Sequence, residues 1–213
     1  MKSSNTPKLR ILLVDDHFVV RLGLADLLST EPGFEVVGEA SDGEEAVNLF
    51  LDLKPDIVVM DYELPKLDGP QSVAAIRAQN PAARILILTV SEAEESIWRA
   101  VVAGASGYVL KSAPREDIVS AVRSVGSGQE YFPTPIAAKL QARRKRPSLS
   151  PREKDVLKCL VRGLANKEIA DFLGLAEPTV KMHLVSVFEK LGARDRTQAA
   201  MLAVQRGLLT AGR

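Results

Sequence analysis

The chain contains 213 residues, of which 46% are hydrophobic and 26% are charged, a composition typical of a folded globular protein. A single cysteine and two histidines exclude a disulfide framework and a zinc site built from these residues. No apolar run is long enough to span a membrane, and residues 1–8 lack the apolar core of a signal peptide. We therefore expect a cytoplasmic protein of one large or two small domains.

The overall net charge of +1 hides an acidic half and a basic half. Residues 1–125 contain 12 Lys and Arg against 19 Asp and Glu, whereas residues 126–213 contain 16 against 8. The two halves therefore carry net charges of −7 and +8. This asymmetry predicts two domains, one whose carboxylates hold a cation and one that binds a polyanion.

In chain order, the first half alternates strand-length apolar runs with segments of helical periodicity. The predicted strands are Leu9–Val14, Phe34–Glu39, Asp56–Met60, Arg84–Thr89 and Gly107–Leu110. The predicted helices are Val19–Leu28, Glu44–Leu53, Pro70–Ala78, Glu94–Ala103 and Arg115–Val125. Five such units predict a flavodoxin-like α/β fold, in which a doubly wound five-stranded parallel sheet has helices on both faces.

The second half changes character after a connector that contains several Gly and Pro residues and one short predicted helix, Ile136–Ala142. From there the pattern is wholly helical. The predicted helices are Arg152–Arg162, Asn166–Leu173, Glu177–Leu191 and Thr197–Arg206, with glycines between them. We expect one domain over residues 10–126, a linker over 127–143 and an all-α four-helix domain with a helix-turn-helix over 144–209.

Polar residues stand at the ends of the predicted strands. Asp15 and Asp16 end the first strand, Asp61 ends the third, Thr89 closes the fourth and Lys111 follows the fifth. Because parallel strands present their carboxyl ends at one edge of the sheet, these side chains converge where ligands bind. Three carboxylates at one place favour a cation, and Mg²⁺ prefers oxygen ligands. A carboxylate can also attack a phosphoryl group, whose charge a metal, a lysine and a hydroxyl would stabilise.

This constellation resembles the receiver domain of two-component response regulators over about residues 9–126. The resemblance implies that Asp61 accepts a phosphoryl group and that Thr89 and Lys111 hold its oxygens. It implies that Tyr108 changes rotamer on activation. The implied Mg²⁺ ligands are Asp15, Asp16, Asp61 and the backbone carbonyl of Glu63. His17 is expected only to start the helix that follows.

Residues 166–185 have the spacing of a helix-turn-helix. Ala170 permits two helices to cross closely, Gly174 makes the turn and Val180 packs the second helix inward. The outer side chains of that helix would reach base edges in the major groove of DNA. The predicted DNA-contacting residues are Thr179, Lys181, Met182, His183, Val185 and Lys190. A helical protein-docking module is the alternative, and the net charge of +8 favours DNA.

A longer motif begins at Leu149-Ser150-Pro151-Arg152-Glu153 and continues through Asn166–Ala170, Thr179–His183 and Lys190–Gly192. It resembles the DNA-binding domain of the quorum-sensing regulator family over about residues 144–209. With the receiver, the chain resembles the nitrate-type subfamily of response regulators. The resemblance implies a homodimer, when active, on inverted half-sites of double-stranded promoter DNA, with Thr197–Arg206 as the dimer contact. It also implies a cognate sensor histidine kinase, with RNA polymerase as a further candidate partner and no membrane.

Two residues depart from the family pattern. Ala176 stands where a serine usually caps the second helix, and losing that acceptor costs about 1 kcal/mol. Glu177 as the cap with Pro178 as the first helical residue would compensate. Val185 stands where a polar residue is common; it can reach a thymine methyl but cannot hydrogen-bond, so we expect an unusual DNA site.

These residues predict a non-enzymatic, DNA-binding response regulator that a histidine kinase phosphorylates on Asp61. Phosphorylation would control dimerisation and sequence-specific promoter binding, and so regulate transcription. One alternative is a constitutive DNA-binding regulator whose receiver is a phosphorylation-independent dimerisation scaffold. Another is an aspartyl-phosphate hydrolase, which needs a second carboxylate two residues after its nucleophile. That pattern fails at Asp15, because His17 occupies the required position, and Asp61 is followed by Tyr62 and Glu63.

Overall fold

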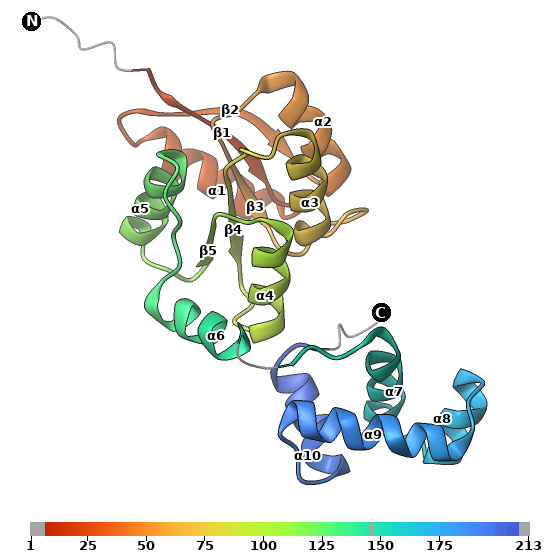
Figure 1. Ribbon diagram of the computed structural model, residues 1–213. Helices are drawn as coiled ribbons and strands as arrows, with labels where there is room; N and C mark the ends of the chain where they lie inside the picture. The colour runs from red at the N-terminus through yellow and green to blue at the C-terminus, as the bar shows by residue number, and fades with distance from the viewer. Residues whose placement is uncertain (1–6, 145–146, 209–213) are drawn as a thin grey trace, which may run out of the picture. The chain divides into compact units, whose positions relative to one another are not determined.

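A five-stranded parallel sheet forms the centre of the first part of the computed structural model, which describes residues 7–144 and 147–208. The strand order is β2-β1-β3-β4-β5 (Figure 1). The strands are β1 (Leu9–Val14), β2 (Phe34–Ala40), β3 (Ile57–Asp61), β4 (Ile85–Thr89) and β5 (Gly107–Leu110). This topology confirms the predicted flavodoxin-like fold.

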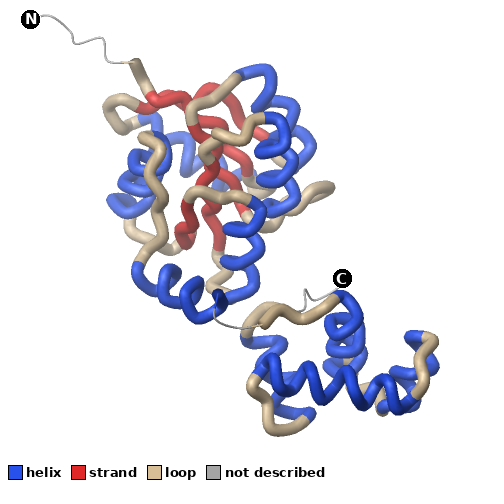
Figure 2. The backbone as a smooth tube through the Cα atoms, viewed as in Figure 1, coloured by secondary structure: helices blue, strands red, loops and turns tan. Residues whose placement is uncertain are grey.

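Helices cover both faces of the sheet. They are α1 (Phe18–Ser29), α2 (Gly43–Leu53), α3 (Gly69–Gln79), α4 (Glu94–Ala103) and α5 (Arg115–Gly126). Helices α1 and α5 lie on one face, and α2, α3 and α4 lie on the other (Figures 1 and 2). Every residue of β3 and β4 is buried, which explains why these strands are almost continuous apolar runs in the sequence.

The α1/α5 face of the sheet contains one hydrophobic core. Side chains from all five strands meet Leu28 of α1 and four residues of α5 there. The α5 residues are Ile118, Ala121, Val122 and Val125. This packing fixes the sheet, and with it the positions of the polar residues at the carboxyl ends of the strands.

Strand β3 lies one residue later than predicted, and the difference matters for the site. Asp56 is outside the strand, where its carboxylate accepts a hydrogen bond from the Arg10 amide at 2.8 Å. Asp61 is inside the strand and pairs in register with Leu88 of β4. The Asp61 backbone is therefore held on the sheet instead of in the loop that follows.

The second part of the chain is helical, with loops and turns between the helices (Figure 2). It contains α7 (Pro151–Val161), α8 (Asn166–Leu173), α9 (Glu177–Leu191) and α10 (Arg196–Gln205), preceded by α6 (Thr134–Arg144). Helix α10 begins one residue before the prediction, because the Asp195 side chain caps it by accepting the Gln198 amide. Gly174 ends α8 with a φ of +64°, a conformation that glycine adopts without strain.

The core of this second part gathers apolar residues from all four helices α7–α10. Val156, Val180 and Val187 are fully buried in it, together with Cys159. The described chain forms two compact units, one containing residues 7–92 and 96–137 and the other containing 93–95 and the residues from 138 onwards. The finer boundaries at 126 and 144 remain predictions, and Leu209 lies outside the described residues. Within the described ranges, no helix is both long and apolar enough to cross a membrane.

Candidate functional site

Two buried carboxylates from different strands meet one lysine at the carboxyl edge of the sheet. Asp15 directly follows β1 and is 2% exposed, while Asp61 ends β3 and is 6% exposed. Lys111 follows β5, and its Nζ lies 2.6 Å from Asp15 Oδ2 and 2.7 Å from Asp61 Oδ2. The predicted convergence of the first, third and fifth strand ends is therefore present. One ammonium group provides the countercharge for both carboxylates.

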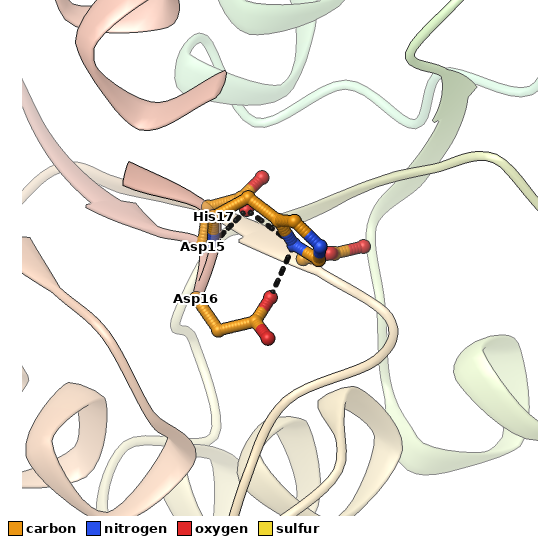
Figure 3. A group of neighbouring side chains, drawn as sticks. Asp15, Asp16 and His17 are labelled. Atoms are coloured by element: carbon orange, nitrogen blue, oxygen red, sulfur yellow. Dashed lines mark hydrogen bonds and ion pairs between the residues drawn. The ribbon is translucent and has the colours of Figure 1, made fainter. Parts of the chain in front are cut away.

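Asp16 and His17 complete an acidic cluster beside this pair. The His17 amide donates to Asp15 Oδ1 at 2.9 Å, and the His17 ring Nδ1 lies 2.7 Å from Asp16 Oδ1 (Figure 3). One donor atom from each of Asp15, Asp16, His17 and Asp61 lies within 4.8 Å of the others. Three carboxylates and one imidazole at this spacing suit a cation that prefers oxygen ligands. His17 was expected only to begin α1, and its contact with Asp16 is a further role.

Burial and pairing act on the protonation of the central residues. Burial raises the pKa of Asp61, and hydrogen bonding to Lys111 opposes this change only in part. For Lys111, burial favours the neutral amine, but hydrogen bonds to Asp15 and Asp61 outweigh it and raise the pKa of the ammonium. Lys111 is therefore held in its charged form, in which it can neutralise anionic oxygens.

Thr89 and Tyr108 lie on the last two strands of the sheet, β4 and β5. The Thr89 hydroxyl is buried and accepts the Ser91 amide at 3.1 Å, while the Thr89 carbonyl accepts the Lys111 amide. The Tyr108 ring is fully buried, and its hydroxyl donates to the Ser91 carbonyl at 2.8 Å. Both residues thus hydrogen-bond to Ser91, in the loop after β4. Their predicted roles in activation remain predictions.

Replacing Tyr108 with Phe is expected to lower the free energy of unfolding of the first unit by about 1 kcal/mol, because a buried hydrogen bond is lost. Urea unfolding followed by the fluorescence of Trp98, the single tryptophan, measures this change. Tyr131→Phe removes a hydroxyl from a half-buried ring and serves as the control. Equal stabilities for Tyr108→Phe and the unaltered chain would contradict a stabilising bond to Ser91.

A second network, which the sequence pattern did not indicate, begins at Tyr62, the residue after Asp61. The Tyr62 hydroxyl lies 3.2 Å from an Arg99 guanidinium nitrogen, and another nitrogen of Arg99 donates to Asp68 Oδ2 at 2.8 Å. Asp68 caps α3, so this network joins α4 to the start of α3 through the residue after Asp61. Glu63 lies in the bend beyond Tyr62 with an exposed side chain. Its predicted role as a metal ligand concerns its backbone carbonyl and stays a prediction.

Helix α9 presents most of the residues predicted to contact DNA. Lys181, Met182 and Val185 are exposed, while Thr179 and His183 are half-buried. The opposite side of α9 is buried in the core through Val180, Leu184, Val187 and Leu191. Helix α9 therefore has one side fixed by packing and one side that faces solvent within this unit.

Lys190, by contrast, is engaged in an internal network. Its Nζ lies 2.8 and 2.7 Å from the two carboxylate oxygens of Glu153 on α7, and the Ser186 hydroxyl donates to the same carboxylate. Glu153 also accepts the Ser150 amide in the capping box that begins α7. Burial favours a neutral Glu153, yet the hydrogen bonds from Lys190, Ser150 and Ser186 outweigh it and lower its pKa to about 2.

The compensation expected at the start of α9 is wrong. Ala176, not Glu177, occupies the N-cap position, and it makes no side-chain hydrogen bond. Glu177 is the first helical residue, so Pro178 is the second. The Ala176 carbonyl accepts the amides of Thr179 and Val180, which closes the first turn through the backbone. Proline still fits there because the first-turn amides have no partner inside the helix.

Comparison with known proteins identifies both units. The family model described as "Response regulator receiver domain" matches residues 11–123, and that described as "Bacterial regulatory proteins, luxR family" matches residues 147–203. The response regulator protein VraR of Staphylococcus aureus is 35% identical over 206 residues, which cover 94% of this chain and 99% of VraR. The chain belongs to the LuxR-family response regulators.

Solved structures of response regulators agree with this assignment. ChrA, from a heme-sensing two-component system, is 38% identical with a TM-score of 0.57, and the match covers 96% of this chain and 100% of that chain. A LuxR-family regulator from Aurantimonas sp. SI85-9A1 is 41% identical with a TM-score of 0.61, covering 64% and 98%. This response regulator therefore has a receiver domain followed by a LuxR-type DNA-binding domain, and its family is one of transcription regulators.

Proposed function

We propose that this response regulator is switched by phosphorylation of Asp61 and then binds promoter DNA through α9. The observation that carries the proposal is the position of the Lys111 ammonium, 2.6 Å from Asp15 and 2.7 Å from Asp61. A buried carboxylate, a second carboxylate and a fixed cation meet at the sheet edge that binds ligands. Phosphoryl transfer needs this combination, because a nucleophile must approach an anion whose charge is neutralised nearby.

Mg²⁺ fits the acidic cluster, because Asp15, Asp16 and Asp61 supply the hard oxygen donors that this ion prefers. The Glu63 carbonyl would complete the protein ligands. His17, through its contact with Asp16, orients that carboxylate. Bound there, Mg²⁺ supplies positive charge that offsets the charge of the phosphoryl oxygens.

The residues of the chain then have distinct roles in the transfer. An Asp61 oxygen attacks phosphorus in an acyl phosphate or in the phosphohistidine of a kinase. An O–P bond forms while the bond to the carboxylate or imidazole leaving group breaks, and the leaving group keeps the electron pair. Lys111 exchanges its contact with Asp61 for a phosphoryl oxygen, and Thr89 turns its hydroxyl to a second one. Tyr108 follows the change at Thr89 and Ser91 and alters the surface of the receiver.

Lys111→Met is expected to tighten Mg²⁺ binding roughly ten-fold. The Lys111 ammonium contacts Asp15 and Asp61, the same carboxylates that would bind the metal, and its positive charge repels Mg²⁺. The same change should slow phosphorylation, because the phosphoryl oxygens lose a cation. Isothermal titration of the full chain with MgCl₂ measures the affinity. Lys8→Met removes an equal charge from an exposed residue and serves as the control. Weaker or unchanged Mg²⁺ binding in Lys111→Met would contradict a metal held by Asp15 and Asp61.

The DNA-binding part of the proposal assigns α9 to the major groove. Its exposed side carries Lys181, Met182 and Val185, in a half of the chain with a net charge of +8. Partners are a cognate histidine kinase, double-stranded DNA with inverted half-sites and, as an extension, RNA polymerase. The active form is a homodimer, in the cytoplasm, with α10 as the contact. The protein acts as a switch and not as a phosphatase.

Selection of genomic DNA fragments by the purified protein tests this function. The unaltered chain and Asp61→Ala are compared at fixed salt, each with and without Mg²⁺ and acetyl phosphate. The proposal expects an inverted motif enriched only by the phosphorylated unaltered chain. Equal enrichment in all four samples would instead support the constitutive regulator, in which the receiver is only a dimerisation scaffold. Sustained hydrolysis of acyl phosphate, without a stable labelled protein, would support a hydrolase.

A further inference from the structure

Helix α9 exposes two large apolar side chains on its solvent side. Met182 is 69% exposed and Val185 is 58% exposed. Residues three apart on a helix are neighbours on one face, so their side chains form a continuous apolar surface. The core-facing side chains of α9 lie on the other side, with Val180 and Val187 fully buried. Met182 and Val185 therefore do not contribute to the packing of this unit.

Three polar side chains on the same helix make contacts within the domain. The Ser186 hydroxyl and the Lys190 ammonium both bind Glu153 at 2.7–2.8 Å. Lys181 Nζ lies 3.0 Å from Glu177 one turn earlier, in an exposed pair that is easily exchanged. In the middle of α9, the exposed side chains of Met182 and Val185 thus offer apolar contacts and no hydrogen bonds to base edges.

We propose that Met182 and Val185 recognise the C5-methyl groups of thymines in the major groove, so that thymine at two positions of each half-site sets the sequence preference. The inference rests on the proposed role of α9 as the recognition helix. Duplex DNA is the occupant that the charge favours, because residues 126–213 carry 16 Lys and Arg against 8 Asp and Glu. Thymine is the one base that presents an apolar group in the major groove, and the minor groove presents none.

Deoxyuridine supplies a direct test, because it differs from thymidine only by that methyl group. The full-length protein with Mg²⁺ and acetyl phosphate is first used to select a duplex from a random pool. Each thymidine of the selected site is then replaced singly by deoxyuridine, and Kd is measured by fluorescence anisotropy at fixed salt. Burial of one methyl-sized group corresponds to about a four-fold change in Kd, which is the loss expected at the contacted positions. Thymines outside the reach of α9 should show no change.

Variants connect each methyl group to a side chain. For each position, the Kd of the duplex with thymidine is divided by the Kd of the duplex with deoxyuridine. Val185→Ala is expected to bring this ratio close to one at one position of the half-site. Met182→Ala is expected to do so at a different position. Phe172→Ala removes another exposed apolar side chain, 65% exposed on α8, and should leave both ratios unchanged. All three positions are exposed, and slow labelling of buried Cys159 confirms that each variant is folded.

The outcomes separate this inference from the function on which it rests. Selection of no duplex under any condition would overturn DNA binding and the inference together. A selected duplex that binds equally well with uracil at every position would overturn the inference and leave DNA binding in place. Ratios and affinities that both stay unchanged in Val185→Ala and Met182→Ala would overturn the inference and show that other residues contact the methyl groups. Loss of affinity in these variants with unchanged ratios would assign the apolar surface to protein contacts instead.

Discussion

Asp61→Asn is expected to carry no phosphoryl group after incubation with acetyl phosphate and Mg²⁺, whereas the unaltered chain acquires a single acid-stable, base-labile group. The amide keeps the size of the side chain and its bond to the Tyr62 amide, in which an oxygen accepts at 2.7 Å. It has no anionic oxygen to attack phosphorus, so labelling should fall to background. Intact-mass measurement of the full chain detects the added phosphoryl group without a radioactive substrate.

Asp52→Asn, on the exposed surface of α2, is the matched control and should be labelled like the unaltered chain. Hydroxylamine should release the group from both, because it cleaves acyl phosphates. Asp15 and Asp16 give the experiment a clear adverse outcome. If Asp61→Asn is labelled at either of these residues, Asp61 is not the only acceptor. A residue that we assign as a metal ligand would then act as the nucleophile.

Glu153→Gln is expected to lower the free energy of unfolding of the DNA-binding unit by about 2 kcal/mol at pH 7, because Lys190 loses its partner and Ser150 and Ser186 lose a charged acceptor. Cys159 provides the measurement, since it is the single cysteine of the chain and is buried in that unit. When the unit unfolds and refolds faster than the thiol reacts, the labelling rate is proportional to the unfolded population. That rate should therefore rise roughly 30-fold. Glu189→Gln, on the exposed side of α9, is the control.

The same variant should change the response to acid. The pKa of Glu153 is about 2 in the folded chain, below its ordinary value of 4.5. A carboxyl group with a lowered pKa stabilises the fold fully above the unfolded value, and this contribution is lost as pH falls from about 4.5 towards 2. The labelling rates of the unaltered chain and Glu153→Gln should therefore converge over that range. A constant difference between pH 7 and pH 3 would exclude an ionised Glu153 as the source of stability.

Hydropathy and strand order predicted much of the receiver site. Strands that are buried on both faces appear as continuous apolar runs, so their ends are visible in the sequence, and parallel topology places those ends at one edge. That reasoning brought Asp15, Asp61 and Lys111 together, and the structure places them in contact. The position of β3 was one residue in error, because the contact between Asp56 and Arg10 depends on a neighbouring strand.

Contacts between distant elements could not be predicted in this way. Arg99 meets Tyr62 and Asp68 across 37 and 31 residues of sequence. Lys190 meets Glu153 across 37 residues, and the motif that suggested a DNA contact for Lys190 contains no sign of that partner. Such pairs depend on how helices pack, and long flexible side chains carry no periodic signal. A carboxylate at the third position of a capped helix was the available hint for Glu153.

The two sides of α9 are subject to different constraints during divergence. Its inner side is tied to α7 by Glu153 and to the core by four buried residues, so most substitutions there reduce the amount of folded protein. Its outer side at residues 182 and 185 bears little of that cost. Substitutions at these two positions can therefore change which operator sequence a related regulator binds, while the fold of the domain is kept. Target preference is expected to evolve faster than thermal tolerance in this lineage.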